Sequence, residues 1–159
     1  MSYENLKEDD DKAIFLLSAL FPYDFDIHTE DLLRYGWGSN FFKDVKTLPI
    51  ARRHMKICVN NLIRANLLIE SDQMGCVKMH DLVRAFVLSN FSKVKQASIV
   101  NHDNMSALTK DTNKSYERIL LKCTGMLEFP TDFIYPKLSL LILMDGNNLL
   151  NIRKIFTKE

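Results

Sequence analysis

Residues 67–81 read LLIESDQMGCVKMHD, and this stretch decides the fold of the first half of the chain. Leu67–Glu70 and Cys76–Met79 each predict a short strand, and Ser71–Gly75 supplies the turn residues between them. A helical pattern begins at once with Asp81 and runs to about Phe91. The stretch therefore predicts a β-hairpin that leads directly into a helix.

Three further helices are predicted before this hairpin. Residues 11–20 are apolar on almost every side, and the acidic run Glu8–Asp11 is predicted to be a solvated lead-in to that helix. Thr29 is a predicted N-cap for a second helix, which ends near Gly36. Between residues 49 and 66, apolar residues recur with a helical period, at Ala51, Met55, Cys58, Val59, Leu62 and Ile63. Helices combined with a hairpin wing predict a mainly α winged helix-turn-helix fold.

The second half of the chain carries a repeat-like pattern. Ile119-Leu120-Leu121 recurs 22 residues later as Leu141-Ile142-Leu143, a spacing typical of leucine-rich repeats. The asparagine expected three positions after Leu143 is displaced, because Gly146 stands there. The pattern predicts the start of an α/β leucine-rich-repeat solenoid. The predicted division is residues 1–92 for the winged helix, 93–115 for a linker with at most a short strand at Ala97–Val100, and 116–159 for incomplete repeats.

The composition and the missing motifs exclude several classes of function. The 159 residues carry a net charge of +1, and the three cysteines form no CxxC pair. No GxxxxGK[ST], GxGxxG, HExxH or GxSxG motif occurs, so neither a catalytic residue nor a metal ligand is predicted. No apolar stretch approaches the roughly 18–20 residues of a membrane span, and no signal peptide is visible. We expect a cytoplasmic protein without a membrane partner.

One pair of residues offers an enzymatic alternative. His54 and Cys58 are spaced i, i+4 on the third predicted helix, where the histidine could act as a base that activates the cysteine thiol as a nucleophile. Cys58 also lies on the apolar stripe of that helix, so we predict that it packs in the core.

One short motif has side chains and a position suited to binding an anion. In Met79-His80-Asp81, the second strand turns into a helix, which places His80 near free backbone N–H groups that favour an anion. An imidazole can donate a hydrogen bond to a phosphate oxygen. Asp81 is the predicted N-cap that fixes this loop, and Met79 is predicted to anchor it in the core. An exposed histidine beside a capped helix, without a ligand, is the alternative that these residues leave open.

Four blocks in the same order resemble the nucleotide-binding region of plant disease resistance proteins of the coiled-coil NBS-LRR type. Ser2–Leu6 resembles the start of its winged-helix segment, Phe15–Asp24 its FLYCALFPED block, Asp31–Gly38 its LIRYWxAEG block, and Met79–Asp81 its Met-His-Asp (MHD) motif. The amino-acid sequence from Ser71 onward is most similar to the lettuce-type cluster of these proteins. The departures are Ser18 for cysteine, Tyr23 for glutamate and Gly36 for tryptophan.

The resemblance implies a fragment of an intracellular immune receptor that acts in the defense response. In such receptors the winged helix closes over ADP held by a P-loop subdomain, and exchange for ATP releases it. His80 would contact the ADP β-phosphate, with Met79 and Asp81 positioning the motif. ADP or ATP is expected only in the full-length receptor and not on the isolated chain. The implied partners are the P-loop and helical subdomains of the same receptor and its remaining leucine-rich repeats, and any ATPase activity would reside in those missing domains.

Two alternatives come from other classes of function. A winged helix can bind nucleic acid through basic residues on its third helix, here Arg52, Arg53, Lys56 and Arg64. Residues 1–92, however, carry 11 Lys+Arg against 13 Asp+Glu, and the predicted wing is not basic, which argues against a nucleic-acid partner. The third possibility is a protein-interaction fragment without nucleotide contact, since incomplete repeats expose apolar surface.

Overall fold

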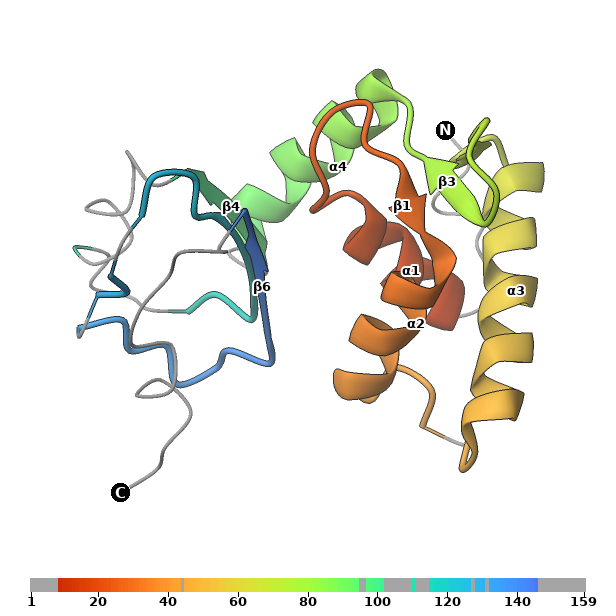
Figure 1. Ribbon diagram of the computed structural model, residues 1–159, viewed down its shortest axis with the longest axis horizontal. Helices are drawn as coiled ribbons and strands as arrows, with labels where there is room; N and C mark the ends of the chain where they lie inside the picture. Colours follow the sequence, from red (N-terminus) through yellow and green to blue (C-terminus); the bar gives the residue numbers. More distant parts are fainter. Residues whose placement is uncertain are drawn as a thin grey trace. The chain divides into compact units, whose positions relative to one another are not determined.

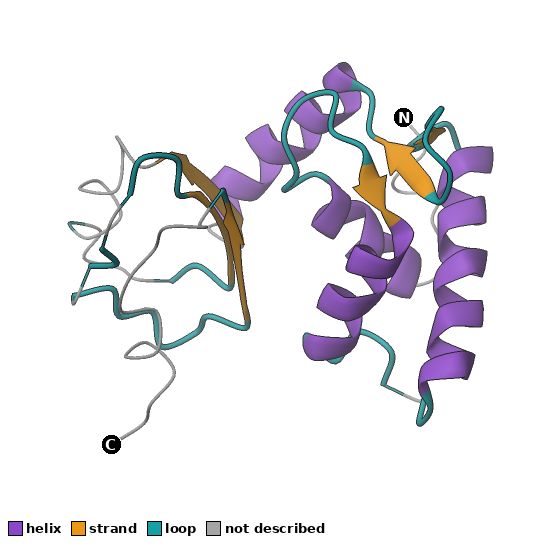
Figure 2. Ribbon diagram, in the orientation of Figure 1, coloured by secondary structure: helices purple, strands orange, loops and turns teal. Residues whose placement is uncertain are grey.

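The computed structural model describes residues 9–43, 45–94, 97–101, 110, 115–126, 128–130 and 132–145. Within these ranges the chain forms four helices and two three-stranded sheets, a mixed α/β arrangement (Figure 2). It divides into two compact units between Asn90 and Phe91. Each unit is described by itself.

The first unit is built on the helices that the sequence predicts. They are α1 (Asp9–Ser18), α2 (Thr29–Gly38), α3 (Leu48–Arg64) and α4 (Asp81–Val94) (Figure 1). Helix α3 turns one apolar stripe inward, because its apolar residues repeat at helical spacing. The largest fully buried side chains of this core are Ile14, Phe15, Leu17, Leu20, Ile27, Leu32, Leu33, Leu62 and Leu68.

A small antiparallel sheet completes the first unit. The predicted hairpin is confirmed as β2 (Ile69–Glu70) and β3 (Cys76–Lys78), with Glu70 opposite Val77. A further strand, β1 (Ile27–His28), pairs with the other edge of β3, so the order is β1-β3-β2. The sequence did not predict β1, because two residues are too short to show an alternating pattern.

The acidic run at the start of α1 corrects the sequence prediction. Asp9, Asp10 and Asp11 lie inside the first turn of α1 and not in a solvated lead-in before it. Asp11 is buried and its carboxylate accepts a hydrogen bond of 3.1 Å from the Asn61 side chain on α3. Asp10 bonds His54 of α3. The run therefore joins α1 to α3, a long-range contact that local sequence cannot reveal.

The second unit contains a parallel sheet. Its strands are β4 (Ala97–Asn101), β5 (Arg118–Lys122) and β6 (Leu140–Met144), in that order. Ile119 pairs with Leu141, so the 22-residue spacing in the sequence is the register of β5 with β6. Strand β4 lies in the segment predicted as a linker, where a short strand was allowed. The core on one face of the sheet consists of Ile119, Leu121, Cys123, Met126, Phe129, Phe133 and Tyr135. Gly146, at the displaced asparagine position, lies outside the described residues.

Candidate functional site

His80 lies exposed between β3 and α4 and caps that helix. Its carbonyl accepts a hydrogen bond from the Arg84 amide at 2.9 Å, and its ring Nδ1 accepts one from the Leu82 amide at 3.3 Å. The prediction that Asp81 is the N-cap is therefore wrong. Asp81 is the first residue of α4, and the imidazole makes the capping bond that a short polar side chain makes in most helices.

The capping bond fixes which nitrogen of His80 can act on a ligand. A neutral imidazole whose Nδ1 accepts a hydrogen bond carries its proton on Nε2, so Nε2 is the donor. None of the residues that the structure describes bonds this Nε2. The site therefore presents an exposed donor beside the N-terminus of α4, where the helix dipole favours negative charge.

The two residues predicted to position His80 lie on either side of it. Met79 is 6% exposed, in agreement with the prediction that it packs in the core. Asp81 lies near the exposed phenol of Tyr23. The negative charge of Asp81, followed by a hydrogen bond to its carboxylate, raises the pKa of Tyr23 above its ordinary value. The positioning role of Met79 and Asp81 stays a prediction.

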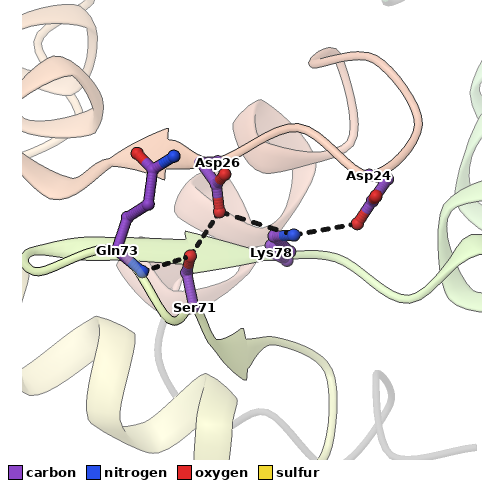
Figure 3. Close-up of polar contacts among 5 residues, drawn as sticks. All are labelled: Asp24, Asp26, Ser71, Gln73 and Lys78. Atoms are coloured by element: carbon purple, nitrogen blue, oxygen red, sulfur yellow. Dashed lines mark hydrogen bonds and ion pairs between the residues drawn. The ribbon is translucent and has the colours of Figure 1, made fainter.

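Lys78, two residues before His80, belongs to a polar network that the sequence did not reveal (Figure 3). Its Nζ lies 2.9 Å from the Asp24 carboxylate and 3.6 Å from that of Asp26. Asp26 also accepts a hydrogen bond from the Ser71 hydroxyl, which in turn accepts one of 3.0 Å from the Gln73 amide. The only signal in the sequence was a pair of acidic residues in the loop before β1, with nothing to indicate their partners.

The enzymatic alternative finds no support in the geometry. Nε2 of His54 lies 2.8 Å from the Asp10 carboxylate, and the ring meets Phe42 edge-on at 5.4 Å between centroids. Cys58 is 1% exposed, so the prediction that it belongs to the core is confirmed. The imidazole is oriented by a carboxylate on another helix, an arrangement that joins α3 to α1.

The basic face of α3 is partly neutralised. Arg52 makes a two-pronged contact with Glu30 of α2, with Nε and Nη2 at 2.6 and 2.9 Å from the carboxylate oxygens. The hydrogen bond from Arg52 lowers the pKa of Glu30 below its ordinary value. Of the four basic residues that a nucleic-acid interface would use, at least Arg52 is committed to an acidic partner.

A cleft of about 520 Å³ lies between α3 and the β2–β3 turn. Met55, Val59 and Val77 contribute apolar walls, and the Glu30–Arg52 pair lies at its edge. His80 is not among its lining residues. The cleft is thus a separate feature from the histidine site.

Among the described residues, no group of three or more His, Cys, Asp or Glu side chains is placed to hold a metal ion. No helix in the described ranges combines the length and the apolar character that crossing a membrane requires.

The chain is similar, over nearly its whole length, to a segment of plant disease resistance proteins, which confirms the resemblance. A probable disease resistance protein of Arabidopsis thaliana is 31% identical over 156 residues, or 95% of this chain and 18% of the relative. The disease resistance proteins UNI and RFL1 of the same plant are 36% and 35% identical over 102 and 103 residues. Each of these two matches covers 62% of this chain, and 11% of UNI and 12% of RFL1. No protein-family model matches. The chain thus spans about a fifth of the length of the first relatives.

Proposed function

We propose that the first unit is the winged-helix part of an ADP/ATP switch in a plant immune receptor, and that His80 contacts the β-phosphate of ADP. One observation carries this proposal: His80 uses Nδ1 to cap α4, which leaves the Nε2 donor exposed at the helix N-terminus. The order of helices, hairpin and helix, and the similarity to disease resistance proteins, support it.

The proposed contact combines two favourable terms. A hydrogen bond from an imidazole N–H to a charged phosphate oxygen is stronger than a bond between neutral groups. The free amides and dipole of the α4 N-terminus add to the attraction for the anion. A nucleotide held by another subdomain would thereby fasten this unit in the closed, inactive state, and the loss of the contact would release it.

The second unit is proposed to begin a leucine-rich-repeat solenoid. Its parallel strands are in register at 21 residues for β4 with β5 and at 22 residues for β5 with β6, within the range of such repeats. Repeats of this kind gain most of their stability from neighbouring repeats. The proposed partners are therefore further repeats, together with the P-loop and helical subdomains of the same receptor.

The nucleotide belongs to the whole receptor in this proposal. The P-loop subdomain would hold ADP or ATP and supply any hydrolysis, whereas this chain contributes the switch contact and is not itself an enzyme. The receptor would act in the cytoplasm in the defense response. We expect no tight, saturable isotherm when the isolated chain is titrated with fluorescent ADP.

The test measures ADP affinity after this chain is co-expressed with a matching P-loop-bearing segment. We expect His80→Ala and His80→Asn each to weaken binding about tenfold or more, roughly 1.4 kcal/mol. Asparagine is a good N-cap, so His80→Asn removes the imidazole donor while keeping the start of α4. His28→Asn, at the other histidine-capped helix, is the matched control and should bind ADP like the wild type.

The outcome separates the proposal from its alternative. If both His80 variants bind ADP like the wild type, the phosphate contact is wrong. That result would favour a protein-interaction fragment, in which the winged helix only packs against its partners.

A further inference from the structure

The loop between α1 and β1 contacts the segment around His80 at several points. The part of this loop that matters is Phe21–Asp26, which begins after Ala19 and Leu20 at the end of α1 and bonds residues within 71–84. At its first residue, the Phe21 carbonyl accepts a hydrogen bond of 2.6 Å from Arg84 Nε on α4. The Phe21 ring is buried and stacks on Phe25 at 5.5 Å, which fixes the loop's own shape.

The middle of the loop bonds the strand that leads to His80. Lys78 joins Asp24 and Asp26, as Figure 3 shows, and its side chain is only 27% exposed. The hydrogen bond that Lys78 donates to Asp24 is the first cause that raises the pKa of Lys78 above its ordinary value. Asp26 reaches further, to Ser71 at the other end of the hairpin. The loop thus holds the hairpin from β2 to the end of β3.

The helix that follows His80 is held by the same loop. Arg84, four residues after His80, donates a hydrogen bond from Nε to the Phe21 carbonyl. His80 therefore has a tethered residue two positions before it and another four positions after it. Both tethers originate in one six-residue loop.

We propose that Phe21–Asp26, which we name the acidic clamp, positions His80 by holding Lys78 on one side and Arg84 on the other. Asp24 and Phe21 are then positioning residues, since they bond Lys78 and Arg84 and not His80 itself. The expected effect of the clamp on ADP affinity rests on the proposed phosphate contact. Its effect on the order of the segment around His80 does not depend on that contact.

Cooperation among the contacts makes the clamp effective. A single exposed ion pair contributes little, because solvent screens it and ordering two side chains costs entropy. Here one loop is ordered once and then makes contacts with Ser71, Lys78 and Arg84. Each contact lowers the entropic cost of the next, so the loss of one is expected to loosen its neighbours.

The first experiment measures amide hydrogen exchange of the whole chain by NMR. Asp24→Asn is the sharpest variant, because Asp24 has a φ of 50° and asparagine tolerates this left-handed conformation. We expect exchange of the Leu82 and Arg84 amides, both bonded to His80, to rise about threefold, with α3 unchanged. The matched control is Asp31→Asn, which breaks the exposed pair with Arg34 on α2 and should leave both amides unchanged.

Unchanged exchange in Asp24→Asn would overturn the clamp. So would faster exchange in both Asp24→Asn and the control, since the effect would then not depend on the loop.

The second experiment measures ADP affinity with the P-loop-bearing segment. Asp24→Asn should weaken binding about threefold, less than His80→Asn, and should add nothing when combined with it. If His80→Asn weakens binding but Asp24→Asn does not, the clamp has no role in positioning and the phosphate contact stands. If Asp24→Asn speeds exchange while His80→Asn leaves binding unchanged, the clamp holds the segment and the proposed function fails.

Discussion

Two histidines cap two helices at opposite ends of β3, and they differ in what surrounds them. His28 ends β1 and precedes α2, whereas His80 follows β3 and precedes α4. In each, Nδ1 accepts a hydrogen bond from the amide two residues on, at 3.2 Å for His28 and 3.3 Å for His80. The local chemistry of the two caps is the same.

The hairpin turn and α3 contact the residues around the His28 cap. The Thr29 amide bonds the Gly75 carbonyl at 2.9 Å, and a Cβ on Gly75 would lie 3.5 Å from Nε2 of His28. Glu30 is bonded to Arg52. The start of α2 is thus tied to the hairpin turn and to α3. Both imidazoles are exposed, and no described residue bonds Nε2 of either, so the two caps differ in packing: the turn at Gly75 lies beside the His28 ring.

Among the substitutions that test this contrast, Gly75→Ala should have the largest effect on stability. The φ of Gly75 is +75°, a conformation that an L side chain adopts at a cost, so Gly75→Ala should lower the free energy of unfolding by about 1–2 kcal/mol. Denaturation in urea measures the change. Gly38→Ala is the matched control, since nothing lies within 4 Å of its Cβ and alanine favours a helix. Equal stability of the Gly75 variant and the wild type would show that the turn accepts a side chain.

His28 itself should give the next largest effect. His28→Ala removes the cap of α2 and is expected to lower the free energy of unfolding by about 1 kcal/mol. His28→Asn should recover most of this loss, because asparagine makes the same kind of capping bond. His80→Ala should cost less than His28→Ala, since the His80 ring does not pack over the hairpin turn. If His80→Ala proves the more destabilising, our contrast between the two caps is wrong.

These caps show how far the sequence could be interpreted. The helices and the hairpin were predicted because their apolar residues repeat at helical spacing or flank a turn rich in polar residues and glycine. Thr29 and Asp81 were predicted as caps because threonine and aspartate usually fill that position. The structure gives the role to His28 and His80, each one residue earlier. Histidine is not among the residue types preferred at N-caps, so residue type favoured Thr29 and Asp81 instead.

The candidate site was predictable in part for a related reason. His80 could be singled out because its position between a strand and a helix is a local property of the sequence. Its supporting contacts are not local: Asp24 and Lys78 are 54 residues apart, and Phe21 and Arg84 are 63 apart. Many charged residues could pair at such distances, so only the folded chain shows which do. The register of the parallel sheet was easier to predict than these contacts, because the spacing between similar apolar stretches in the sequence equals the offset between paired strands.

The two helix starts also differ in the direction of their pH dependence. Near His28, the hydrogen bond from Arg52 lowers the pKa of Glu30. The contribution of this pair to stability is therefore present above the ordinary pKa of 4.5 and is lost as pH falls through the lower folded value. Near His80, the hydrogen bond that Lys78 donates to Asp24 raises the pKa of Lys78. The contribution of this pair to stability is therefore present below the ordinary pKa of 10.5 and is lost as pH rises through the higher folded value.

The smallest expected effect tests this opposition. At neutral pH, Glu30→Gln and Lys78→Met should each lower the midpoint of thermal unfolding by on the order of one or two degrees, because one partner of each pair is exposed and solvent screens the interaction. The deficit of Glu30→Gln should vanish toward acid pH, and that of Lys78→Met only toward alkaline pH. Far-UV circular dichroism between pH 3 and pH 11 would follow both. If the two deficits vanish at the same end of the range, the pairs do not act independently, and the difference between the two helix starts does not extend to their charges.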